Sequence, residues 1–159
     1  MRITVLAVGR VKDGPERDLI ARYVERARAA GRSLGLSGPD VIELPESRAA
    51  RPEDRKAEEA RALSDKVAGA AMIVLDERAR SMSSEDFAAF VRTRRDGGTR
   101  GLAFVIGGAD GLDPELRARA DLALSFGAMT LPHQIVRLLI AEQIYRAMSI
   151  IAGHPYHRA

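Results

Sequence analysis

The sequence predicts a parallel α/β fold, a single sheet flanked by helices. Apolar runs of strand length recur along the chain, and a helix-like stretch separates each from the next. This alternation is typical of parallel sheets, because parallel neighbours need a crossover connection. The expected strands are Ile3–Val8, Val41–Pro45, Met72–Leu75, Leu102–Ile106 and Leu122–Leu124.

Each stretch between or after the strands begins with a helix start signal. Four begin with proline, which suits the first helical position, and one begins with the serine pair Ser83-Ser84. Gly97-Gly98 closes the third helix, and residues 31–38 are expected to form a loop before the second strand. The expected helices are Pro15–Ala30, Pro52–Val67, Ser84–Arg95, Pro114–Ala120 and Pro132–Ile151.

Length and composition narrow the classes of protein. With 159 residues, the chain fits one domain spanning residues 1–159. The absence of cysteine excludes thiolate metal sites and catalytic thiols. The N-terminal apolar run is too short for a signal peptide, and no segment approaches a membrane span, so we expect a cytoplasmic protein without membrane contact.

The last predicted helix is apolar over more than one face. A helix lying on a sheet needs an apolar stripe of only about 100°. The excess must be buried either by other elements of the same domain or by a second copy of the chain. We favour a symmetric homodimer, the commonest oligomer, built on residues 132–151.

Three loops follow predicted strands where open α/β sheets bind ligands. They are Leu75-Asp76-Glu77, the glycine turn Ile106–Gly111 and the segment Phe126–Leu131. We expect them to converge on one pocket. A Walker loop and a GxGxxG turn after the first strand are both missing, which disfavours nucleoside triphosphates and nicotinamide dinucleotides. Taken alone, the glycine turn indicates no more than a strand-to-helix connection.

The C-terminal third carries a more specific pattern. It contains Leu124-Ser125-Phe126-x-x-Met129-Thr130-Leu131-Pro132-His133 and ends in His154-Pro155-Tyr156-His157-Arg158. With the opening strand and Ile73–Glu77, these segments closely resemble the RlmH family, and the resemblance covers the whole chain. The family belongs to the SPOUT superfamily and methylates N3 of a pseudouridine in 23S ribosomal RNA on the assembled ribosome.

The resemblance implies a homodimer that binds S-adenosylmethionine in a C-terminal trefoil knot. Such a knot would not be expected from general topology rules. No metal is implied. The implied cofactor positions are Leu75, Gly107, Phe126, Gly127, Ala128, Met129, Thr130 and Leu131. The apolar side chains among them are equally compatible with an ordinary core.

Methyl transfer to a ring nitrogen requires that a proton be removed, which makes histidine the candidate base. We hypothesise that the tail folds over the partner subunit's pocket, where His157 accepts or relays the proton and Arg158 holds phosphate. Tyr156 could stack on the target base. His133 is a second candidate base, although it could instead simply donate to a backbone carbonyl.

Two further arginines are candidates for RNA phosphate. Arg137 has no obvious partner nearby in sequence, whereas Arg146 follows Glu142 by four residues and could form a helix-surface pair. The terminal His-x-x-His pattern could bind metal, but it has no third ligand nearby.

Other functions remain open at this stage. A related methyltransferase could act on a ribose 2′-hydroxyl or on transfer RNA, and a noncatalytic ribosome-binding factor could retain the fold. A small-molecule α/β enzyme is disfavoured by the absence of a serine elbow and of a metal cluster.

Overall fold

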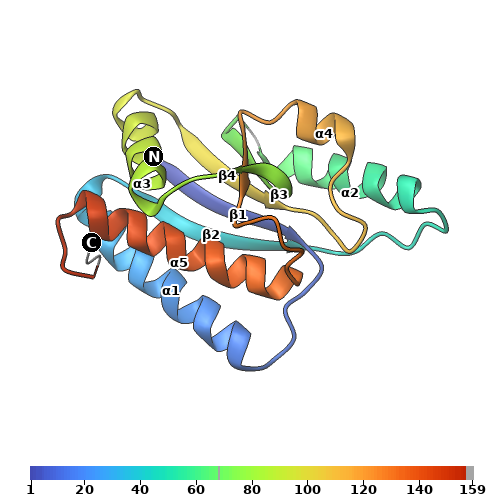
Figure 1. Ribbon diagram of the computed structural model, residues 1–159, viewed down its shortest axis with the longest axis horizontal. Coiled ribbons are helices and arrows are strands. Elements are labelled where there is room, and N and C mark those ends of the chain that lie inside the picture. Colours follow the sequence, from blue (N-terminus) through green and yellow to red (C-terminus); the bar gives the residue numbers. More distant parts are fainter. Residues whose placement is uncertain (68, 157–159) are drawn as a thin grey trace.

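The computed structural model describes residues 1–67 and 69–156. It contains one parallel sheet with the strand order β2-β1-β4-β3-β5, in agreement with the predicted fold class. The strands are β1 (Arg2–Val8), β2 (Ser37–Leu44), β3 (Ala71–Ser81), β4 (Gly101–Ile106) and β5 (Leu122–Ser125). Figure 1 shows the helices on the two faces of this sheet.

The helices begin close to their predicted starts. They are α1 (Pro15–Gly31), α2 (Pro52–Val67), α3 (Ser84–Asp96), α4 (Pro114–Ala118) and α5 (His133–Ile151), with a short 3₁₀ helix at Arg32–Leu34. The Ser83 side chain caps α3 by accepting a hydrogen bond from the Asp86 amide at 3.0 Å. Among the described residues, no helix has the length and apolar character that a bilayer crossing requires.

The sheet lies between two layers of helices (Figure 1), and a hydrophobic core fills the space on each of its faces. On one face, residues such as Val5 and Phe104 pack against α1, α3 and α5. On the other face, residues such as Leu6 and Val105 pack against α2 and α4. Because successive strand residues point to opposite faces, the central strand β4 is buried throughout its length.

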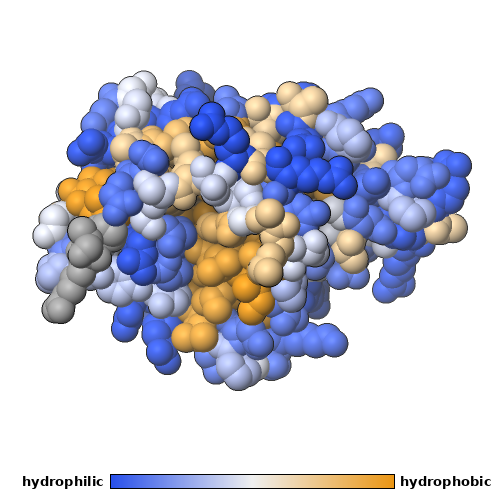
Figure 2. Space-filling view, viewed as in Figure 1, coloured by the Kyte–Doolittle hydropathy of each residue, from blue (hydrophilic) through white to orange (hydrophobic). Residues whose placement is uncertain are grey.

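Helix α5 lies in the same core as α1 and α3, with Ile140, Ile144 and Met148 almost fully buried. Its own domain therefore covers more of α5 than the sequence led us to expect. Part of the apolar surface of α5 is covered less completely: Ile135 and Leu139, one turn apart, are only partly buried and belong to neither core. In Figure 2 an apolar patch lies over this helix.

Two strands extend more than one residue beyond their predicted bounds. β2 begins at Ser37 rather than at Val41, within the segment expected to be a loop. β3 continues past Leu75 to Ser81, and the continuation is polar. Leu124 of β5 pairs first with Leu75 and again with Arg80, so residues 76–79 bulge out between two paired stretches. We call residues 76–79 the β3 excursion.

Candidate functional site

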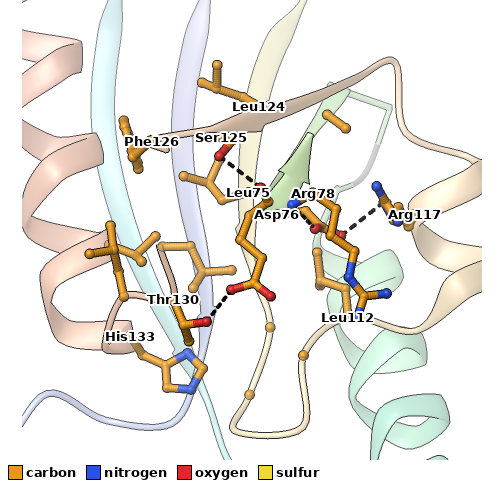
Figure 3. Close-up of a pocket in the computed structure, with 18 of the residues that line it drawn as sticks. Leu75, Asp76, Arg78, Leu112, Arg117, Leu124, Ser125, Phe126, Thr130 and His133 are labelled. Atoms are coloured by element: carbon orange, nitrogen blue, oxygen red, sulfur yellow. Dashed lines mark hydrogen bonds and ion pairs between the residues drawn. The ribbon is translucent and has the colours of Figure 1, made fainter. Parts of the chain in front are cut away.

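A cavity of about 840 Å³ opens at the carboxyl ends of β3, β4 and β5. All three of the loops expected to meet there do line it, so this prediction is confirmed. Figure 3 shows part of the lining. The lining residues are Lys56, Leu75, Asp76, Glu77, Arg78, Ile106, Gly107, Gly108, Ala109, Asp110, Gly111, Leu112, Pro114, Arg117, Ala118, Ala123, Leu124, Ser125, Phe126, Gly127, Met129, Thr130, Leu131, His133 and Val136.

The loop after β4 is a closed glycine turn. The Gly111 amide donates to the Gly108 carbonyl at 3.0 Å. A Cβ on Gly107 would lie 2.9 Å from the Gly111 carbonyl carbon, and one on Gly108 would lie 2.7 Å from Glu59 Oε2. The turn is therefore compact because these two positions lack side chains, and its backbone lies bare against the cavity.

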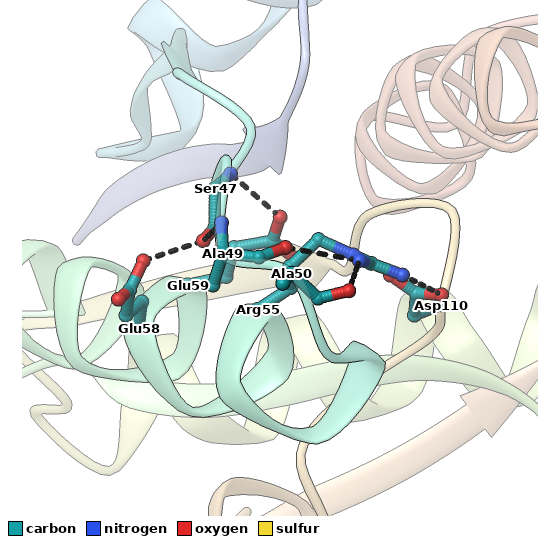
Figure 4. Close-up of polar contacts among 7 residues, drawn as sticks. All are labelled: Ser47, Ala49, Ala50, Arg55, Glu58, Glu59 and Asp110. Carbon is teal, nitrogen blue, oxygen red and sulfur yellow. Dashed lines mark hydrogen bonds and ion pairs between the residues drawn. The ribbon is translucent and has the colours of Figure 1, made fainter.

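A polar network anchors this turn to the start of α2 (Figure 4). Arg55 donates from Nε and Nη2 to both Asp110 oxygens at 2.7 and 3.0 Å, and from Nη1 to the carbonyls of Ala49 and Ala50. The hydrogen bond from Arg55 lowers the pKa of Asp110 and thereby keeps it ionised. A two-pronged guanidinium contact of this kind fixes orientation as well as distance.

The opposite wall consists of the β3 excursion and the segment after β5. The Ser125 hydroxyl donates to the Gly127 carbonyl at 2.8 Å and lies 3.3 Å from the Glu77 carbonyl. Thr130 Oγ1 donates to Glu77 Oε2 at 2.6 Å. Both the backbone and the side chain of Glu77 are thus tied to the segment that closes the cavity. Gly127 adopts φ +134°, and no atom lies within 4 Å of the place where its Cβ would be.

The predicted cofactor residues lie together. Seven of the eight line the cavity, and Ala128 alone does not. Leu75 is 9% exposed and gives the cavity an apolar floor, with Phe126 packed beside the core. Met129, one of the implied cofactor positions, lines the cavity and is 81% exposed.

These features fit an adenosine-containing ligand. The cavity offers bare backbone at the glycine turn, apolar side chains at its base and open space beside Gly127. Such a mixture of apolar walls and a few placed polar groups is usual for cofactor sites. Within the described part of the chain, no group of three or more His, Cys, Asp or Glu residues could hold a metal ion.

Arg137 does not lie where an RNA contact would require it. Its side chain is 3% exposed; Nη2 donates to the Val8 and Gly9 carbonyls at 2.6 and 2.9 Å, and Nη1 donates to Glu43 at 2.9 Å. Burial lowers the pKa of Arg137. The prediction that Arg137 binds phosphate is therefore wrong: this guanidinium joins α5 to the ends of β1 and β2.

The described part of the tail folds back onto the second half of α5. The Tyr156 hydroxyl donates to Glu142 at 3.1 Å, and its ring lies 4.6 Å from that of Tyr145 and 5.0 Å from the Arg146 guanidinium. Arg146 also bonds to Glu142, which is the helix-surface pair considered above. Burial, with the neighbouring Tyr23 and Glu142, raises the pKa of Tyr156, so the phenol stays protonated.

Of the remaining candidate catalytic residues, one lies in the cavity and two belong to the C-terminal tail. His133 lines the cavity at the start of α5. His157 and Arg158 lie outside the described residues. The excursion side chains Asp76 and Arg78 were not predicted as site residues, and Arg117, which pairs with Asp76 at 2.9 Å, was missed as well. The run of charged residues Asp76-Glu77-Arg78, directly after the third apolar strand, was the sequence signal that could have identified the first two.

Two solved structures share this fold and are described as a methylase family protein and a methyltransferase. A probable methylase family protein from Haemophilus influenzae Rd KW20 is 14% identical, with a TM-score of 0.53 over 99% of this chain and 70% of that chain. A probable methyltransferase from Bordetella pertussis Tohama I is 16% identical, with a TM-score of 0.52 over 92% and 95%. At these identities the likeness shows the fold.

Sequence comparison identifies the family. The family model described as "Predicted SPOUT methyltransferase" matches residues 1–157. Proteins named ribosomal RNA large subunit methyltransferase H are similar over the full length of both chains, at 58% identity in Xanthobacter autotrophicus and 56% in Rhizobium meliloti. The chain belongs to the SPOUT methyltransferase family.

Proposed function

We propose that this protein is an S-adenosylmethionine-dependent methyltransferase that modifies N3 of a pseudouridine in 23S ribosomal RNA. The observation that carries the proposal is the cavity: seven of the eight positions that the family resemblance assigns to the cofactor line it together. The names of the full-length relatives support the same reaction class and the large-subunit substrate.

The bound cofactor would supply an electrophilic methyl group, and the chain's own residues would orient the reactants and accept a proton. The glycine turn and the segment 126–131 would hold the adenosine part and exclude water. His157 is the proposed proton acceptor, with His133 as the alternative. Tyr156 is not proposed as the acceptor, because its raised pKa makes it a hydrogen-bond donor.

Two copies of the chain would form the working enzyme. The partly buried Ile135 and Leu139 supply an apolar surface for a partner. The cavity lies at the N-terminal end of α5, whereas Tyr156 contacts Glu142, Tyr145 and Arg146, about 14 to 20 Å further along the helix. Tyr156 held there does not line its own cavity, which supports a site completed by the partner's tail.

The substrate would be the assembled ribosome in the cytoplasm. A net charge of +3 gives little nonspecific attraction to RNA phosphate, so recognition would depend on shape presented by the folded particle. The target base would be unstacked into the cavity, as enzymes acting on base atoms require.

The test is methyl transfer from labelled S-adenosylmethionine to ribosomes from cells that lack the enzyme. Nucleoside mass spectrometry should then find methylated pseudouridine in 23S RNA, with far less product on protein-free RNA. A 2′-O-methyl nucleoside, or labelled transfer RNA, would contradict the proposed substrate. Absence of any transfer would contradict the proposed activity.

A further inference from the structure

The carboxylates that line the cavity differ in whether a cation pairs with them. Three carboxylates line it, and two already face a guanidinium: Asp76 pairs with Arg117 at 2.9 Å, and Asp110 pairs with an arginine of α2 at 2.7 Å. Glu77 differs, since its carboxylate bonds only to the neutral Thr130 hydroxyl, and no cation of the described residues lies within ion-pair distance. Glu77 therefore brings an uncompensated negative charge to the cavity.

Arg78, the next residue, brings the opposite charge. Its side chain is exposed and lines the cavity, yet it makes no hydrogen bond or ion pair with any residue in 1–67 or 69–156. The two neighbours face the same cavity because the excursion turns at this point: the Arg78 amide donates to Asp76 Oδ1 at 2.8 Å. Figure 3 shows Arg78 and Thr130 on opposite sides of the site.

This pair of free charges suits an α-amino acid group. Such a group carries an ammonium with three donors beside a carboxylate, and a guanidinium matches a carboxylate in two-pronged geometry. The base of the cavity is apolar, formed by Leu75 and Leu124, which are 9% and 4% exposed. An adenosyl amino acid whose adenosine occupies that base would therefore direct its charged end toward the excursion.

We infer that Glu77 and Arg78 bind the amino acid end of the cofactor, with Glu77 accepting from the ammonium and Arg78 pairing with the carboxylate. The inference rests on the proposed use of S-adenosylmethionine. It assigns the β3 excursion to cofactor selection: ligands that share the adenosine but lack the amino acid gain nothing from these two residues.

Isothermal titration calorimetry on the full chain tests this with three ligands and two variants, Glu77→Gln and Arg78→Gln. S-adenosylmethionine and S-adenosylhomocysteine both carry the amino acid, whereas 5′-methylthioadenosine lacks it. We expect each variant to bind the first two about tenfold or more weakly and the third within about twofold of the unchanged protein. Glu25→Gln on α1 and Arg80→Gln just after the excursion are the matched controls, with no expected change.

The outcomes separate cleanly. Parallel loss for both amino acid ligands, with 5′-methylthioadenosine unaffected, supports the inference. Unchanged affinity in either variant overturns it, as does a loss confined to S-adenosylmethionine, which would mean that the sulfonium charge is being sensed. Equal losses for all three ligands would indicate a damaged pocket and would also overturn it. If the unchanged protein binds none of the three, the proposed function itself fails.

Discussion

At the scale of single residues, the shape of the site depends on glycines, whose lack of a side chain lets the turn after β4 close. A side chain at Gly107 would clash with atoms that cannot easily move away. A Cβ there would lie 2.9 Å from the carbonyl carbon and oxygen of Gly111 and 3.0 Å from the Leu112 amide nitrogen. All three are backbone atoms of the same turn. Any larger residue must therefore open the turn.

Gly107→Ala should accordingly weaken S-adenosylmethionine binding by about tenfold or more and destabilise the fold by about 1–3 kcal/mol. Calorimetry and thermal unfolding measure the two effects. Gly98→Ala is the control: it has φ +76° but open space around its Cβ, and it lies beyond α3, so it should cost stability without changing affinity. Unchanged binding by Gly107→Ala would show that the turn does not touch the ligand.

Arg137 shows a limit of sequence reasoning at the same scale. Its three acceptors lie about 94 to 129 residues away along the chain, so local spacing gave no sign of them. A lone arginine on an apolar helix looked available to phosphate for that reason. Only the packed fold brings the ends of β1 and β2 against α5.

Arg137→Ala should lower the free energy of unfolding by about 3–5 kcal/mol, because two carbonyls and Glu43 lose their shared donor. Chemical denaturation measures this loss. Arg2→Ala, which breaks an exposed pair with Asp40, should cost about 1 kcal/mol or less. If Arg137→Ala kept full stability but lost ribosome binding, phosphate contact would be its role after all.

At the scale of elements, the pattern of apolar residues was enough to predict the strands and helices. All five strands and all five predicted helices are present, and the Ser83 and Gly97 boundaries of α3 are confirmed. The second half of β3 was missed because its residues are mostly charged or polar and show no apolar alternation. The β3 excursion depends on how β3 pairs with β5, a contact between distant parts of the chain that local sequence patterns do not reveal.

Helix α5 carries the element-scale prediction. Leu139→Glu should shift the protein from dimer to monomer and weaken association by about thirtyfold or more, since a charge would replace one of the two partly buried apolar side chains proposed to meet the partner. Analytical ultracentrifugation measures the dissociation. Val41→Glu on the edge strand β2 places the same charge on another exposed apolar position and should leave association unchanged. A protein that is monomeric without any substitution would refute the dimer.

At the scale of the whole molecule, the cavity could be predicted from where loops fall in a parallel sheet. The identity of the reaction could not, because methyl transfer leaves no signature in periodicity; the family resemblance supplied it, and the family comparison confirmed the family. The trefoil knot and the cytoplasmic location stay predictions.

Deleting Tyr156–Ala159 should leave S-adenosylmethionine affinity within about twofold and abolish methylation. Mixing this variant with Gly107→Ala should restore part of the activity, because a mixed dimer joins one intact cavity to one intact tail. Turnover of mixed and unmixed samples on ribosomes measures both effects. Full turnover by the shortened protein would refute the role of the tail, and failure of mixing would argue that each chain completes its own site.

The docking of Tyr156 on α5, away from the cavity at the start of that helix, has a consequence for the enzyme's kinetics. If each centre borrows its final residues from a second copy, a solitary subunit is inert however well it retains its donor molecule. Turnover per milligram would then fall as the protein is diluted below the dissociation constant of the dimer. Cells holding few copies would thus modify a smaller share of their ribosomes than the copy number alone predicts.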